Sequence, residues 1–167
     1  ESLQHILKQI KDVGFFALDT ETTSLNEREA DLVGISIAFE VGKAFYIPVG
    51  HMENSEGGDE GTLFSDSTLD QRQLPIDIVI AELKPLLEDP SILKVGQNIK
   101  YDSKILKNYS IKLAALDDTM LMSFCLNGGK HGHGMDTLSS RYLDYDPISI
   151  KELIGSGKTA KTFDKVP

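Results

Sequence analysis

Two carboxylates directly follow an apolar run near the start of the sequence. Residues 13–18 are apolar throughout, as is typical of a strand buried on both faces, and Asp19-Thr20-Glu21-Thr22 comes next. Side chains two positions apart on a strand share a face, so Asp19 and Glu21 are expected side by side. Two neighbouring carboxylates repel each other, and a divalent cation such as Mg²⁺ relieves the repulsion. Taken alone, the Asp19-Thr20-Glu21 tripeptide favours a simpler interpretation, in which both acids are solvent-exposed and help to form a turn after the strand.

A second polar group follows a later strand. Residues 92–96 predict a strand that ends in glycine, and Gln97-Asn98-Ile99-Lys100-Tyr101-Asp102 comes next. Asn98 and Asp102 are four residues apart, which predicts that both lie on one face of a helix over about residues 98–109. Asp102 is therefore a candidate third carboxylate for a metal site. Asn98 is compatible with a substrate contact or with a helix cap that needs no function.

The rest of the pattern supplies the elements that position these residues. Hydrophobic periodicity predicts two strands, 32–40 and 44–49, joined by a corner at 41–43, and further helices over 2–12, about 76–87, 119–126, 135–143 and part of 147–154. A strand hairpin followed by alternating helices and strands predicts an α/β fold with a mixed sheet.

Composition limits the classes of protein. The chain has 167 residues, of which 40% are hydrophobic, enough for one sizeable core and one domain. No apolar run approaches the ~20 residues that cross a bilayer, so no membrane span is expected. The single cysteine, Cys125, lies in an apolar helix and is expected to be buried; it excludes an intramolecular disulfide and agrees with a reducing compartment.

The net charge of −9 argues against a nucleic-acid partner, but the charge is unevenly distributed. Residues 53–70 hold six acids and no base, which predicts a solvated, mobile loop without contacts. The second half carries a basic cluster that is either a solvated helix face or a rim that contacts phosphate: Lys94, Lys100, Lys104, Lys107 and Lys112.

Taken together and in order, several segments resemble the 3′–5′ exonuclease domain of bacterial DNA polymerase I. They are residues 19–22, 32–36, 46–49, 94–102, 118–121, 135–138 and 155–158. That family belongs to the DEDD exonucleases. The resemblance therefore implies a ribonuclease H-like three-layer fold, with a central mixed β-sheet of a strand hairpin and parallel strands flanked by helices. It also implies two-metal hydrolysis of 3′-terminal phosphodiesters with release of nucleoside monophosphates.

The resemblance assigns roles residue by residue. It matches Asp19, Glu21 and Asp102 to three of the family's four metal-binding carboxylates, which implies Mg²⁺ or Mn²⁺ as cofactor. Leu25 would wedge against the last bases, the alternative being an ordinary core leucine. The full set implied to line the path of the 3′-terminal nucleotides is Thr20, Thr22, Leu25, Gln97, Asn98 and Tyr101. The implied partners are a single-stranded DNA 3′ end and a covalently attached polymerase domain, and the implied setting is a cytoplasmic monomer without membrane contact.

The family's fourth carboxylate lies in a Tyr-x-x-x-Asp motif beyond the Gly/Lys-rich segment, and the sequence stops at Pro167 before it. We therefore expect residues 1–167 to form one exonuclease domain without its C-terminal helices, feeble or inactive alone. Two residue pairs have the spacing of a DEDD motif but stand at the wrong place in the family's motif order: Tyr142 with Asp146, and His131 with Asp136. Two alternative functions stay open, an RNase D-type exoribonuclease and a non-catalytic structural domain beside a polymerase.

Overall fold

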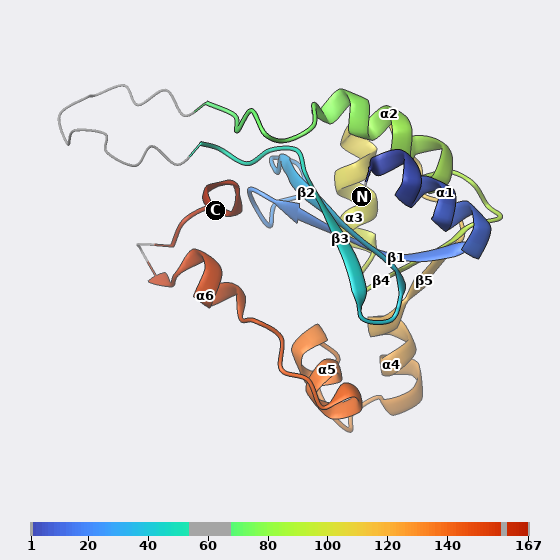
Figure 1. The fold of residues 1–167 in the computed structure, drawn as a ribbon. Coiled ribbons are helices and arrows are strands. Elements are labelled where there is room, and N and C mark those ends of the chain that lie inside the picture. Colours follow the sequence, from blue (N-terminus) through green and yellow to red (C-terminus); the bar gives the residue numbers. More distant parts are fainter. Residues whose placement is uncertain (1, 54–67, 158–159, 167) are drawn as a thin grey trace.

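The computed structural model describes residues 2–53, 68–157 and 160–166. Figure 1 shows a sheet with helices packed against it and a C-terminal segment that extends from it. The elements in chain order are α1 (Leu3–Val13), β1 (Phe15–Thr22), β2 (Leu32–Glu40), β3 (Lys43–Pro48), α2 (Ile76–Leu87), β4 (Leu93–Gly96), α3 (Lys100–Asn108), β5 (Leu116–Asp118), α4 (Thr119–Asn127), α5 (Met135–Leu143), α6 (Ile150–Ile154) and a 3₁₀ helix, η2 (Phe163–Lys165). The helices and strands predicted from periodicity are confirmed, with ends displaced by a few residues.

The sheet is mixed, as expected. Its strand order is β3-β2-β1-β4-β5. The pairs β1–β2 and β2–β3 are antiparallel, whereas β1–β4 and β4–β5 are parallel. The predicted hairpin is confirmed, because Glu40 pairs with Lys43 across the turn. The strand β5 was not predicted, since its three residues are too few to show a period.

One face of the sheet carries the core. Ile10 of α1, Phe16 of β1, Leu83 of α2 and Ile105 of α3 are all fully buried in one apolar cluster. On the opposite face of β1, however, Phe15 is 46% exposed and Ala17 is exposed too. The prediction that this strand is buried on both faces is therefore wrong. The run of apolar residues correctly predicted a strand, but it does not indicate whether a second layer of elements covers that strand.

The same strand begins later than predicted. Val13 is the last residue of α1, and Gly14 ends the helix with a left-handed backbone (φ 81°). This conformation suits glycine and turns the chain into β1. The strand then continues to Thr22, so that Asp19 and Glu21 belong to the strand itself.

Lys94 does not belong to an exposed basic cluster, as the sequence suggested. Its side chain is fully buried, and Nζ donates to the carbonyls of Leu86 (3.2 Å), Asp89 (2.8 Å) and Ile92 (2.7 Å). Burial lowers the pKa of Lys94. Its place on β4 turns the side chain towards the core, and carbonyls at the end of α2 and in the segment before β4 accept hydrogen bonds from the ammonium group. The other four lysines of the cluster are exposed.

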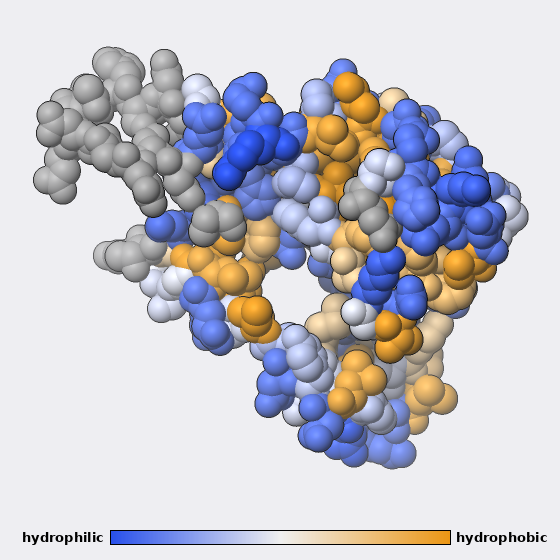
Figure 2. Space-filling view, in the orientation of Figure 1, coloured by the Kyte–Doolittle hydropathy of each residue, from blue (hydrophilic) through white to orange (hydrophobic). Residues whose placement is uncertain are grey.

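The expectation that Cys125 is buried is wrong. Cys125 is exposed, because α4 lies largely uncovered: Leu121, Phe124 and Leu126 on the same helix are at least 60% exposed. Apolar side chains are visible at the surface over α4 in Figure 2. The apolar composition of this helix therefore does not reflect burial.

Most of the acidic segment, residues 54–67, lies outside the described residues. Its two ends do make contacts, which contradicts the expectation of none there. Glu53 accepts a hydrogen bond from the Thr68 hydroxyl (3.0 Å), and Asp70 forms an ion pair with Arg72. No helix among the described residues combines the length and the apolar character that a membrane crossing needs.

Candidate active site

β1 presents two acids on its open face. Asp19 and Glu21 are partly exposed, whereas Thr20 between them is buried on the core side. This alternation confirms that the two carboxylates share a face. In the pairing with β2, Asp19 lies opposite Ser36 and Glu21 lies opposite Gly34.

Helix α3 brings the third acid to the same strand. Asp102 is 2% exposed, and its Oδ1 accepts hydrogen bonds from the Thr20 amide (2.9 Å) and from the Thr20 hydroxyl (2.6 Å). Both bonds go to one oxygen and orient the carboxylate. Thr20, implied to line the substrate path, is thus turned to the core side and holds Asp102.

The three acids influence one another electrostatically. Burial raises the pKa of Asp19 to about 6, with repulsion from Glu21 as the second cause. Burial also raises the pKa of Asp102 to about 6, opposed by its hydrogen bond from Thr20 and reinforced by Asp19. The pKa of Glu21 is raised by burial and by Asp102. The charged form of each acid is therefore disfavoured by burial and by another of the three acids.

The donor set suits a hard divalent cation. Carboxylate oxygens are the ligands that Mg²⁺ and Mn²⁺ prefer, and a cation offsets both the burial and the mutual repulsion that raise these pKa values. Among the described residues, however, no three His, Cys, Asp or Glu side chains are grouped so as to hold one ion. An ion at this site would therefore need water or substrate oxygens to complete its shell, which is usual for Mg²⁺.

Two of the implied substrate-path residues hold the loop after β1. The Tyr101 hydroxyl donates to the Ser24 carbonyl (2.6 Å) and lies 2.6 Å from the Thr22 hydroxyl. Leu25 follows in this loop and is 92% exposed, so its interpretation as a core leucine is wrong. Its role as a wedge stays a prediction.

The turn between β4 and α3 departs from expectation. Asn98 has a left-handed backbone (φ 59°) and precedes the helix, so it neither shares a helical face with Asp102 nor caps α3 with its side chain. The acceptor at this turn is Asp118, whose Oδ1 and Oδ2 accept from the amides of Asn98 and Ile99 (3.1 Å each). Gln97 donates to the His133 carbonyl (2.7 Å).

Asp118 is a structural residue of the site that sequence reasoning missed. Its carboxylate also caps α4, accepting from the amides of Met120 (2.9 Å) and Leu121 (3.3 Å). An acid immediately before an apolar helical run is a cap signal, and this pattern was visible in the sequence. The hydrogen bonds that Asp118 accepts from Asn98 and Ile99, about twenty residues earlier, were not visible in the sequence.

The architecture is that of the ribonuclease H-like exonucleases. A solved structure described as the apo form of the nuclease matches with a TM-score of 0.65, covering 96% of this chain and 63% of that one at 19% identity. The RNase D of Escherichia coli, an exoribonuclease involved in structured RNA processing, matches with a TM-score of 0.56 over 96% of this chain and 39% of its own, at 17% identity. At such identities the likeness is one of fold.

Sequence comparison defines the family. A family model described as 3′-5′ exonuclease matches residues 1–165. The DNA polymerase I of Rhizobium leguminosarum is 41% identical over 174 residues, which cover 99% of this chain and 16% of that protein. The chain therefore belongs to the 3′–5′ exonuclease domains of DNA polymerase I, and it spans about one sixth of the length of this relative.

Proposed function

We propose that this domain hydrolyses the 3′-terminal phosphodiester of single-stranded or frayed DNA, releasing nucleoside monophosphates, and that Asp19, Glu21 and Asp102 hold the metal ions it needs. The observation that carries the assignment is that α3 places Asp102 against Thr20, between Asp19 and Glu21 on β1. The pKa of each of the three acids is raised through burial and through another of the three. Members of the DEDD exonucleases use divalent ions, and Mg²⁺ or Mn²⁺ fits this oxygen donor set.

Each residue of the candidate site has a distinct role in this proposal. Asp19 and Glu21 offer their carboxylates from the open face of the strand, and Thr20 fixes the orientation of Asp102 from below. Asp19, Glu21 and Asp102 would hold divalent ions, which would supply activation of water near neutral pH and charge stabilisation at the leaving 3′ oxygen. The exposed Leu25 contacts the terminal bases, and Tyr101 fixes the loop that carries it.

The remaining substrate-path assignments are Thr22, beside Tyr101, and Gln97 and Asn98, in the turn before α3. We assign the covalently attached polymerase domain as partner, because the matched relative is about six times longer. Proofreading of replicating DNA would place the domain, as a monomer, in the bacterial cytoplasm. With no three ligands grouped around one ion among the described residues, residues 1–167 alone are expected to be feeble.

The test is release of the terminal nucleotide. Matched 3′-labelled DNA and RNA oligomers are incubated with Mn²⁺ and with the wild type, Asp19→Ala, or the control Asp136→Ala, which removes an exposed acid on α5. We expect DNA to be cleaved faster than RNA, and Asp19→Ala alone to lower the rate by more than about tenfold. Equal rates for wild type and Asp19→Ala would contradict the site. Faster cleavage of RNA would instead favour the exoribonuclease alternative.

A further inference from the structure

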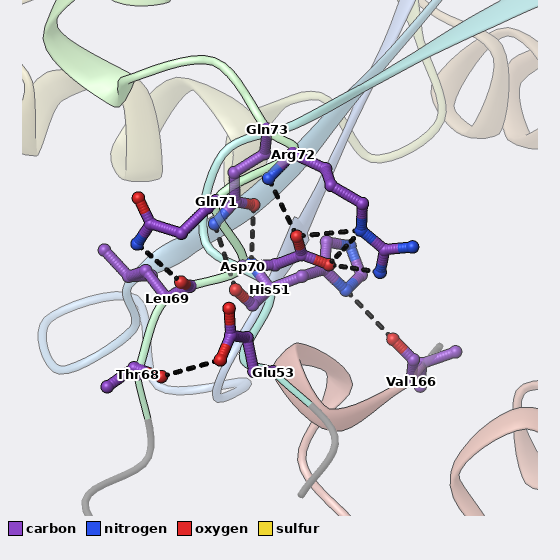
Figure 3. A network of polar contacts seen from close by, with 9 residues as sticks. All are labelled: His51, Glu53, Thr68, Leu69, Asp70, Gln71, Arg72, Gln73 and Val166. Atoms are coloured by element: carbon purple, nitrogen blue, oxygen red, sulfur yellow. Dashed lines mark hydrogen bonds and ion pairs between the residues drawn. The ribbon is translucent and has the colours of Figure 1, made fainter.

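A histidine outside the acidic site is held in a fixed orientation. The His51 amide donates to Gln73 Oε1 (3.0 Å), and Gln73 Nε2 donates back to the His51 carbonyl (3.0 Å). Beyond this backbone clamp, ring atom Nδ1 lies 3.0 Å from the carbonyl oxygen of Val166, as Figure 3 shows. The ring is thus tied to a segment 115 residues away in the sequence.

The Val166 contact assigns the tautomer of His51. A carbonyl oxygen only accepts hydrogen bonds, so Nδ1 must carry the hydrogen. In the neutral ring Nε2 is then an acceptor, and it lies 2.7 Å from the hydroxyl oxygen of Tyr46. Tyr46 therefore donates its O–H to His51.

Tyr46 places this hydroxyl beside the acidic site. Its oxygen lies 2.0 Å from the point that a Cβ on Gly34 would occupy, so only glycine leaves room for it there. Gly34 is paired directly with Glu21, and Cβ positions paired in this way lie about 5 Å apart on one face of a sheet. The phenol oxygen is consequently within reach of the Glu21 carboxylate. Burial and the charge of Glu21 both raise the pKa of Tyr46.

From this geometry we infer that His51 is a positioning residue, which takes up the O–H of Tyr46 and so keeps the Glu21 carboxylate free to bind a metal ion. This inference rests on the proposed function, because the metal-binding role of Glu21 is part of that proposal. Without His51 the hydroxyl would lose its acceptor and turn to the Glu21 carboxylate, whose oxygens also accept hydrogen bonds. A cation would then have to displace it.

The test is Mn²⁺ affinity by titration calorimetry in the 167-residue chain. We expect His51→Phe to bind Mn²⁺ on the order of tenfold more weakly than the wild type. The double variant Tyr46→Phe/His51→Phe should recover the lost affinity, because the competing hydroxyl is gone. His51→Gln should resemble the wild type, since the amide can donate to Val166 and accept from Tyr46. Tyr142→Phe is the matched control. The hydroxyl of Tyr142, on α5, likewise lies beside a histidine Nε2, that of His131 (3.2 Å).

Equal affinities for the wild type and His51→Phe would overturn the inference. So would a double variant as weak as His51→Phe, which would show that His51 only supports the fold. Mn²⁺ binding that Asp19→Ala leaves unchanged would instead overturn the proposed function, and the inference with it. A measurement without substitution is the ¹⁵N spectrum of His51, where hydrogen on Nδ1 supports the inference and hydrogen on Nε2 overturns it.

Discussion

Asp19 and Asp102 carry their charges at a cost to the metal-free protein. Both pKa values lie near 6, above the ordinary range of an aspartate near 4. A carboxyl group whose pKa is raised by folding contributes stability that is present below its unfolded pKa and is lost as the pH rises through its folded pKa. At neutral pH these two groups therefore oppose folding until a cation neutralises them.

Replacing Asp19 by asparagine isolates this effect. At pH 7 the amide removes one charge from the cluster, so the metal-free Asp19→Asn variant should have a free energy of unfolding about 1–3 kcal/mol higher than the wild type. The same variant should gain less stability from Mn²⁺. Urea unfolding with and without Mn²⁺ measures both effects, and Asp136→Asn, at an exposed position, should change neither. A metal-free Asp19→Asn variant less stable than the wild type would contradict the electrostatic description.

At the scale of elements, α3 connects the acidic site to the loop that follows β1. Tyr101 donates to the Ser24 carbonyl, Lys104 pairs with the Glu27 carboxylate (2.6 Å), and the Asn108 side chain donates to the Glu27 carbonyl (3.0 Å). Three residues at helical spacing thus hold the loop with the exposed Leu25, on the helix that also carries Asp102. The position of Leu25 and the position of Asp102 are therefore set together.

Removing one of these contacts should loosen the loop. In Tyr101→Phe the Ser24 carbonyl keeps only the Thr22 hydroxyl as donor (3.0 Å), so amide hydrogens of residues 24–27 should exchange severalfold faster, with a loss of about 1 kcal/mol of local stability. Hydrogen exchange read by mass spectrometry checks this, and exchange in β2 serves as the internal reference. Unchanged exchange in the loop would show that Tyr101 does not hold it.

The elements that were predictable from sequence are those with a local period. The hairpin of β2 and β3 follows from two strand runs joined by the corner at 41–43, and the shared face of Asp19 and Glu21 follows from alternation. The turn at Asn98 was not predictable, because its left-handed backbone is held by Asp118 from another element. Lys94 misled for a related reason, since the carbonyls of Leu86, Asp89 and Ile92 gather around Nζ only in the fold and give no sequence signal.

The same limit applies to the molecule as a whole. Phe15 and Ala17 on β1, and Cys125 on α4, are apolar in sequence yet exposed. Apolar composition reports that a side chain favours burial, whereas exposure depends on which other layers are packed there. The total charge was similarly uninformative, because the acids of the site and those of residues 53–70 contribute to it alike.

At the scale of the whole molecule, stability should depend on pH and metal together. Without metal, the free energy of unfolding should fall by a few kcal/mol as the pH rises from about 4 to above 6, because Asp19 and Asp102 lose their protons in this range. With Mn²⁺ the fall should be smaller, and the stabilisation by Mn²⁺ should grow over the same range. Urea unfolding at a series of pH values measures both curves. A metal-free stability that rises through this range would contradict the prediction.

The location of bound metal tests the central claim most directly. A crystal of the chain grown at pH 7.5 with Mn²⁺ and a short single-stranded DNA is measured at the manganese absorption edge. The predicted result is anomalous density against the carboxylates of Asp19, Glu21 and Asp102, with the 3′ end of the DNA beside it. Manganese bound elsewhere, such as at His131 and His133, with none at these three acids, would contradict the account.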